Sequence, residues 1–120
     1  MRNIGSASLQ TNKLKTLFLN ARSLRNKISE LKAIVSTESY DLIAISETWI
    51  KQTDIDSEFN ISGYDKIAKH RIHQRGGGII LYYKKFLELE HCYIETLKDL
   101  EVIVVRINNV KTKLLLSLIY

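Results

Sequence analysis

Short apolar runs that end in polar residues recur along the first half of the chain and predict β-strands. Leu42 to Ile45 is four apolar residues in a row, bounded by polar ones. It is too short for a free-standing helix and is predicted to be a strand buried on both faces. Residues 15–20 contain Thr-Leu-Phe-Leu and predict another strand, which ends at Asn20. Asn20 and Glu47 are therefore each expected where a strand runs out, a position at which α/β folds place ligand-binding groups.

Between these two strands the apolar spacing changes to that of a helix. The residues at helical spacing are Leu24, Ile28, Leu31, Ile34 and Val35, with charged residues on the other faces. Ser23 or Asn26 is expected to cap the start of this helix, which should fade over residues 37–39. A strand, a helix and a strand within about 30 residues form a crossover unit, so both strands should share one sheet. Asn20 and Glu47 would then lie at the same edge of it.

The remaining pattern predicts one small α/β domain over residues 14–120, preceded by a loose lead-in over residues 1–13. Glu88 to Ile94 fits neither a strand nor a helix clearly. The other expected elements are a polar surface loop over 51–62, strands over 64–68, 79–83 and 102–107, a turn at Asn108-Asn109, and an antiparallel return over 110–120.

Composition narrows the class of protein only slightly. The chain has 120 residues and 45% hydrophobic content, which is ordinary for a globular domain. Its 18 Lys and Arg against 13 Asp and Glu give a net charge of +5, a mild indication of an anionic partner such as nucleic acid. The single cysteine, Cys92, excludes an internal disulfide and fits a reducing compartment. We expect neither a membrane span nor a secretory signal, and hence a nuclear or cytoplasmic location.

Several notable residues also have ordinary structural explanations. On local grounds alone, Glu47 fits a solvated strand-end carboxylate, and Asn20 fits a cap of the turn that follows it. Gly76-Gly77-Gly78 lacks the following Lys-Ser/Thr of a phosphate-binding loop, and predicts a turn through which the backbone enters a crowded strand. Trp49 and Tyr82 are expected to be packing residues. His70 and His73 lack the spacing of a zinc site and are expected to be exposed loop residues.

Three segments together carry a resemblance to a known family. They are Leu-Asn-Ala-Arg-Ser-Leu-Arg-Asn-Lys at 19–27, Tyr-Asp-Leu-Ile-Ala-Ile-Ser-Glu-Thr-Trp at 40–49, and Arg-Gly-Gly-Gly-Ile at 75–79. In this order they resemble the endonuclease of non-LTR (LINE-type) retrotransposons. That endonuclease belongs to the endonuclease/exonuclease/phosphatase superfamily, with the apurinic/apyrimidinic endonucleases and pancreatic deoxyribonuclease. The resemblance covers residues 14–120. The phosphoinositide phosphatases and sphingomyelinases of the superfamily are a lesser alternative.

The resemblance implies a four-layered α/β sandwich of the deoxyribonuclease I-like type, present here in part. It implies Mg²⁺ (or Mn²⁺) as cofactor and DNA as substrate, nicked to leave a 3′ hydroxyl that primes reverse transcription. The implied partners are the downstream remainder of the domain and a reverse transcriptase. Glu47 matches the metal-ligand glutamate, and Asn20 the asparagine that orients the metal site and the scissile phosphate. Tyr120 matches the start of a Tyr-Arg-Pro-Pro segment near that phosphate.

These residue types suit phosphodiester hydrolysis on chemical grounds as well. The reaction needs a cation to neutralise charge that builds up on the phosphate oxygens. Mg²⁺ keeps most of its waters, so one or two protein oxygens suffice to hold it. Basic residues at the rim would then bind the DNA backbone through a salt-dependent interaction. The candidates for this role are Arg22, Arg25, Lys69, Arg71 and Arg75.

The chain also departs from the family pattern. Arg22 stands where apurinic-site relatives often have an aspartate. The family's later Asp-x-Asn pair and C-terminal Asp-His have no counterpart, and His70, His73 and His91 lie in the wrong region to replace that histidine. The last residues are as apolar as any strand, so we expect Tyr120 to interrupt a longer domain, and the isolated chain to be inactive. The alternative is a non-catalytic, decayed fragment or a basic nucleic-acid-binding remnant.

Overall fold

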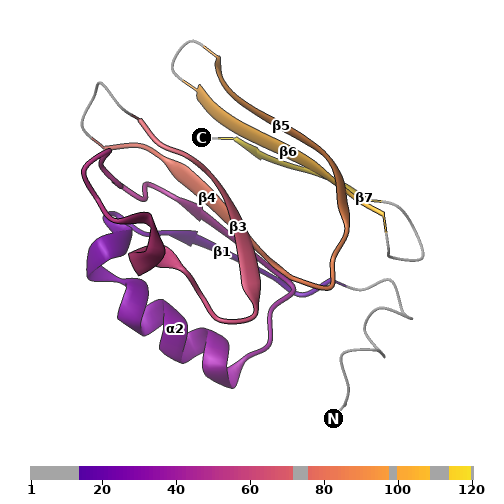
Figure 1. The fold of residues 1–120 in the computed structure, drawn as a ribbon, viewed down its shortest axis with the longest axis horizontal. Coiled ribbons are helices and arrows are strands. Elements are labelled where there is room, and N and C mark those ends of the chain that lie inside the picture. Colours follow the sequence, from indigo (N-terminus) through magenta and orange to yellow (C-terminus); the bar gives the residue numbers. More distant parts are fainter. Residues whose placement is uncertain (1–13, 72–75, 98–99, 109–113, 120) are drawn as a thin grey trace.

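The structure, a computed structural model, describes residues 14–71, 76–97, 100–108 and 114–119. Figure 1 shows how strands and short helices follow one another along the chain. In chain order the elements are β1 (Thr16–Asn20), η1 (Leu24–Asn26), α2 (Ile28–Thr37), β2 (Leu42–Ser46), η2 (Asp56–Phe59), β3 (Tyr64–Lys69), β4 (Ile79–Lys84), β5 (Leu89–Leu97), β6 (Leu100–Ile107) and β7 (Leu114–Ile119).

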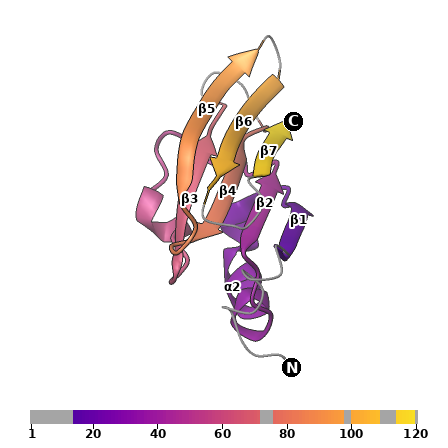
Figure 2. The same cartoon turned by 90° about the vertical axis from the view of Figure 1, so that its right-hand side faces the viewer.

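Within the described residues the strands form two sheets. The first has the order β1-β2-β4-β3, with β1 parallel to β2 and the other neighbours antiparallel. The second is an antiparallel sheet in the order β5-β6-β7. Figure 2 shows the second sheet against the first, with α2 at the side of β1 and β2. Helix, sheet and sheet are successive layers of a partial four-layered α/β sandwich, which confirms the predicted fold class.

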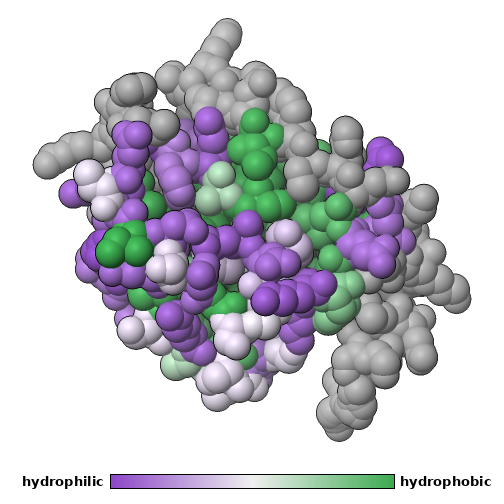
Figure 3. All heavy atoms as spheres, in the orientation of Figure 1, coloured by the Kyte–Doolittle hydropathy of each residue, from purple (hydrophilic) through white to green (hydrophobic). Residues whose placement is uncertain are grey.

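Alternation along β2 divides the apolar residues between two clusters. Ile43 and Ile45 face α2 and pack in a cluster that includes Leu31, whereas Leu42 and Ala44 face the second sheet. All four residues of β2 from Leu42 to Ile45 are at most 3% exposed, so the prediction of a strand buried on both faces is confirmed. In the view of Figure 3, hydrophobic residues gather between the two sheets, and hydrophilic ones dominate over η2 and β3.

The connection from β1 to β2 contains the predicted helical segment, but the start of that segment differs from the prediction. The predicted helix is divided into the 3₁₀ turn η1 and helix α2. Neither Ser23 nor Asn26 caps by a side-chain hydrogen bond, and Lys27 is the N-cap of α2. Ser23 is instead used through its backbone, which has φ 86° and donates to Glu47 O at 3.0 Å. Ser23 thus stands at the N-cap position of η1, as expected, but without a side-chain cap, and Asn26 is not a cap.

The segment over residues 51–62 was expected to be a surface loop, and this is wrong in one respect. It contains η2, whose Phe59 is 1% exposed, and Ile61 is also buried. The carbonyl of Phe59 accepts a hydrogen bond from the buried Tyr82 hydroxyl at 2.5 Å. Burial of that hydroxyl raises the pKa of Tyr82. Phe59 therefore anchors this loop to the first sheet, although the residues around it in the sequence are mostly polar.

The remaining strands follow the sequence closely. Residues 64–68 and 79–83 are strands as expected, and the unclear segment over 88–94 belongs to β5. β7 pairs antiparallel with β6, which confirms the predicted return of the chain. The predicted turn includes Asn109, which lies outside the described residues.

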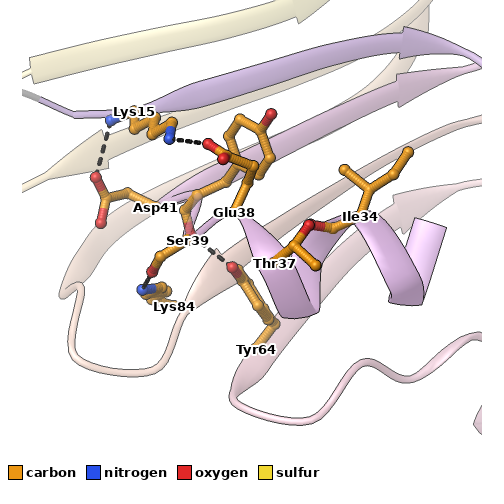
Figure 4. A network of polar contacts seen from close by, with 9 residues as sticks. Lys15, Ile34, Thr37, Glu38, Ser39, Asp41, Tyr64 and Lys84 are labelled. Carbon is orange, nitrogen blue, oxygen red and sulfur yellow. Dashed lines mark hydrogen bonds and ion pairs between the residues drawn. The ribbon is translucent and has the colours of Figure 1, made fainter.

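A polar network joins the end of α2 to the start of β2 (Figure 4). The Lys15 amide donates to Asp41 Oδ2 at 2.8 Å, and the Lys15 ammonium pairs with Glu38 at 2.5 Å. The Tyr64 hydroxyl donates to the Tyr40 carbonyl at 2.5 Å. These contacts tie β1, β2 and β3 together at the end of the first sheet opposite to Asn20 and Ser46. These contacts support the register of the parallel pair at this end.

Candidate active site

Asn20 and Glu47 meet at one end of the first sheet, as the crossover unit predicts. Asn20 ends β1 opposite Ser46, and Glu47 is the residue after β2. The Asn20 amide nitrogen Nδ2 donates to Glu47 Oε2 at 2.9 Å, across 27 positions of sequence. The hydrogen bond to an amide fixes the orientation of the carboxylate, which remains partly accessible to solvent.

The loops that follow β1 and β2 continue side by side beyond the sheet. Ala21 N donates to Ser46 O at 2.9 Å, and Leu24 N donates to Thr48 O at 2.9 Å. Glu47 and Trp49 have φ values of 53° and 54°, in the left-handed region that non-glycine residues rarely adopt. Such conformations cost roughly 1–2 kcal/mol each and cluster at functional sites, so the surroundings must hold this loop in place.

The glycine run lies directly against this loop. Gly78 O accepts from Thr48 N at 3.2 Å, and Gly77 O accepts from Trp49 N at 3.0 Å. A Cβ atom on Gly78 would lie 2.4 Å from Thr48 Oγ1, and one on Gly77 would lie 2.4 Å from the Arg71 guanidinium carbon. Both glycines also have positive φ. The predicted glycine turn into a crowded strand is confirmed, and its neighbour is the loop that carries Glu47.

The structure also shows a buried carboxylate that the sequence reasoning missed. Glu101 lies in β6, and its side chain is 2% exposed. Its Oε1 accepts from Gly78 N at 3.0 Å, and its Oε2 accepts from Arg71 Nε at 3.1 Å and Nη2 at 2.6 Å. The sequence signal for it is that Glu101 directly precedes the apolar run Val102 to Val105. An acid there must be paired when the strand is buried.

The five candidate DNA-binding cations have different surroundings. Arg22 is exposed beside Asn20, and Lys69 is half-buried at the end of β3. Arg71 is paired with Glu101, as described. Arg75, like Tyr120, lies outside the described residues. A role in DNA binding stays a prediction for all five.

Arg25 is engaged in a surface cluster on the loop over residues 51–62. Its guanidinium pairs with Asp54 and with Glu58, the latter at 3.3 Å, and lies 5.9 Å from the centre of the Phe59 ring. The backbone N–H of Lys51 and the guanidinium of Arg25 hold the pKa of Asp54 below its usual value. The charge of Arg25 is thus largely balanced within the chain.

Two expectations about other side chains near the site are wrong. Trp49 was expected to be a packing residue but is 43% exposed, with its indole against Gly76. His70 was expected to be an exposed loop residue but is half-buried, and no partner for its buried Nδ1 is found among the described residues. Burial lowers the pKa of His70. His73 lies outside the described residues.

The donors at the end of β1 and β2 suit a hard divalent cation. Glu47 supplies a carboxylate and Asn20 an amide, and oxygen is the ligand atom that Mg²⁺ prefers. The described residues hold no cluster of three or more His, Cys, Asp or Glu side chains that could enclose a metal. One carboxylate and one amide fit Mg²⁺ or Mn²⁺, which keep most of their waters.

The fold is that of the deoxyribonuclease I-like α/β sandwich, a class represented among solved structures by apurinic/apyrimidinic endonucleases and related exonuclease and phosphatase enzymes. No protein-family model matches the chain, and neither does any curated protein. No described helix has the length and apolar character needed to cross a membrane.

Particular structures share this fold at low sequence identity. The chain is similar to the AP endonuclease LMAP from Leishmania major, with a TM-score of 0.70, 18% identity, and coverage of 100% of this chain and 44% of that one. It is also similar to an AP endonuclease from Archaeoglobus fulgidus, with a TM-score of 0.63, 17% identity, and coverage of 81% and 38%. It is also similar to the 3′ phosphatase NExo from Neisseria, bound to a product DNA hairpin, with a TM-score of 0.67 and 10% identity. That match covers 86% of this chain and 40% of the phosphatase. The chain thus spans less than half of each.

Proposed function

We propose that this chain is the N-terminal portion of a divalent-metal-dependent endonuclease that hydrolyses DNA phosphodiester bonds. The observation that carries the proposal is the hydrogen bond between Asn20 and Glu47 at the carboxyl ends of adjacent parallel strands. The names of the structural neighbours support the substrate class, since two are AP endonucleases and one is bound to DNA. The motifs around Asn20, Glu47 and Gly76 favour the retrotransposon branch, in which the nick primes reverse transcription.

The residues of this chain would have distinct tasks at such a site. Glu47 and Asn20 would hold Mg²⁺ or Mn²⁺, which when bound neutralises charge on the phosphate. The Asn20 amide orients one oxygen of the Glu47 carboxylate. Arg22, exposed on the loop after β1, would contact the DNA backbone beside the scissile phosphate.

We further propose that the 120 residues are inactive by themselves and act with downstream sequence and a reverse transcriptase. The family's water-activating Asp and His have no counterpart in this sequence. Phe18 is 65% exposed on β1, the outer strand of the first sheet in the described part of the chain. Its neighbours Leu17 and Leu19 pack in the cluster against α2, so Phe18 projects from the opposite face of β1, where further strands of the second sheet would cover it.

A plasmid-nicking assay with Mg²⁺ tests the proposal. The 120-residue chain and the longer product of the same reading frame are each compared with a Glu47→Ala variant. Glu30→Ala is the matched control, because Glu30 is an exposed glutamate on α2. We expect nicking by the longer protein and its Glu30→Ala variant, and loss of at least about a hundredfold in rate with Glu47→Ala. Nicking that survives Glu47→Ala would disprove the assignment, and the absence of nicking would favour a decayed remnant.

A further inference from the structure

Glu101 connects the second sheet to the glycine run of the first. Its carboxylate accepts hydrogen bonds from Gly78 N on one oxygen and from the Arg71 guanidinium on the other. Arg71 follows β3 and Gly78 precedes β4, so Glu101 holds both sides of the β3–β4 connection. The Glu101 side chain is 2% exposed and that of Arg71 is 25% exposed, which places the ion pair largely out of water.

We infer that Glu101 and Arg71 are positioning residues for Glu47, acting through the glycine run. The inference rests on the proposed function, since it assigns these residues to the site that would hold the metal. The chain of contacts is continuous. Glu101 fixes Gly78, whose carbonyl accepts from Thr48 N, and Gly77 O accepts from Trp49 N. Glu47 is the residue before Thr48, so its backbone is held from the second sheet.

Steric contact makes this linkage stiff. A Cβ on Gly77 would come within 2.4 Å of two atoms of the Arg71 guanidinium, so the guanidinium lies directly against the Gly77 backbone. A Cβ on Gly78 would meet Thr48 Oγ1 at 2.4 Å. The glycines therefore leave no space between the ion pair on one side and the Glu47–Trp49 loop on the other. A displacement of Arg71 must be felt by that loop.

Energetics favours a role in geometry over one in stability alone. A buried ion pair gains little net stability, because removing both charges from water offsets their attraction. Glu47 and Trp49 nevertheless have positive φ, a conformation that is unfavourable for non-glycine residues and persists only when the surrounding structure holds it. Residues that hydrogen-bond a metal ligand commonly serve in this way, and their loss lowers metal affinity by about 10–100-fold; Glu101 acts one step further back, through Gly78 and Thr48.

Trp49 is the only tryptophan of the chain and reports on the loop without any metal. Glu101→Gln keeps an acceptor for Gly78 N but removes the ion pair. Glu38→Gln is the matched control, because it removes the exposed pair with Lys15 by the same chemical change. At a temperature where circular dichroism shows all forms folded, we expect Glu101→Gln to shift Trp49 emission and raise its quenching by acrylamide. Glu38→Gln should do neither.

Mn²⁺ binding to the 120-residue chain, followed by electron paramagnetic resonance, tests the connection to the site. Glu47→Ala defines the binding that belongs to the site. We expect Glu101→Gln to weaken that binding about tenfold. A lower melting temperature with unchanged Trp49 quenching and Mn²⁺ affinity would overturn the inference and indicate a purely structural role. Mn²⁺ binding that Glu47→Ala does not reduce would instead disprove the proposed metal site, and the fluorescence result would still decide whether Glu101 positions the loop.

If Glu101→Gln does not fold, the variants Gly77→Ala and Gly63→Ala test whether Arg71 positions the loop. Gly77→Ala would push the Arg71 guanidinium away, whereas Gly63→Ala places the same methyl group at a similar φ with nothing within 4 Å. Both variants carry the backbone penalty, but only Gly77→Ala should change Trp49 quenching and Mn²⁺ affinity. Equal behaviour of the two variants would exclude Arg71 as a positioning residue.

Discussion

Gly78 lies in close contact with the loop that carries Glu47. It has φ 89°, and a Cβ there would lie 2.4 Å from Thr48 Oγ1. We expect Gly78→Ala to lower the free energy of unfolding by about 2–4 kcal/mol, since the left-handed backbone and the overpacking each contribute. Urea unfolding of the variant and the wild type measures this difference. A loss below about 1 kcal/mol would show that the contact yields easily.

Thr48 offers a test of which atom causes the crowding. Its buried Oγ1 has no hydrogen-bond partner among the described residues. Thr48→Ala removes the atom that a Cβ on Gly78 would meet. We therefore expect the double variant to recover about 1–2 kcal/mol of the loss caused by Gly78→Ala. Additive losses in a double-mutant cycle would contradict this explanation.

His70 gives stability a pH dependence in the mildly acid range. Burial lowers its pKa, with Lys66 and Lys69 acting in the same direction and Asp56 and Asp54 opposing it. The folded chain therefore resists a proton that the unfolded chain accepts below about pH 6.5. Stability should be fully present above that pH and fall as the pH drops through the folded pKa. Unfolding of the wild type and His70→Gln from pH 7 to pH 5 should show a shallower dependence in the variant.

At the scale of elements, α2 is held by one face. Leu31 is 1% exposed in the cluster against the first sheet, whereas Ile34 is 45% exposed on the same helix. We expect Leu31→Ala to destabilise the chain by about 2–4 kcal/mol and Ile34→Ala by less than about 1 kcal/mol. Chemical unfolding of both variants measures the difference. Similar losses would mean that α2 is packed on both sides.

The β1–α2–β2 unit could be predicted because its signals are local. Four apolar residues at 42–45, helical spacing from Leu24 and polar strand ends determine the elements and bring Asn20 to Glu47. The details that failed depend on tertiary contacts. Ser23 makes a backbone hydrogen bond to Glu47 O in place of a side-chain cap, and the Phe59 carbonyl bonds the hydroxyl of Tyr82, which is distant in sequence.

The rest of the site could not be predicted because its partners are distant in sequence. Glu101 meets Arg71 across 30 positions and Gly78 across 23, and no spacing rule connects them. Trp49 has a positive φ that a tryptophan rarely adopts, and no sequence pattern predicts it. The loop after β2 is hydrogen-bonded to the glycine run and to the loop after β1, contacts that a sequence pattern does not describe.

At the scale of the whole molecule, the net charge of +5 favours an anionic partner. Two described arginines near the candidate site differ in their surroundings. Arg22 is exposed, whereas Arg25 is paired with Asp54 and Glu58. We expect Arg22→Ala to reduce the slope of log affinity for a short DNA duplex against log salt by about 1, and Arg25→Ala to change it less.

Fluorescence anisotropy across a salt series measures these slopes. Lys32→Ala, on the exposed side of α2, is the control for lost charge alone. Equal slopes for the Arg22→Ala and Lys32→Ala variants would remove Arg22 from the DNA-binding surface.

The separation between the Asn20–Glu47 pair and its support from Glu101 has a consequence for synthesis on the ribosome. The pair and the β1–α2–β2 unit are complete once residue 47 has left the exit tunnel, whereas the supporting carboxylate follows 54 positions later, at 101. Because domains generally fold as units, Asn20 and Glu47 are not expected to keep this geometry on a nascent chain that still lacks β6. At the proposed metal site, ribosome-bound chains that lack β6 should therefore bind Mn²⁺ more weakly than chains from which β6 has emerged.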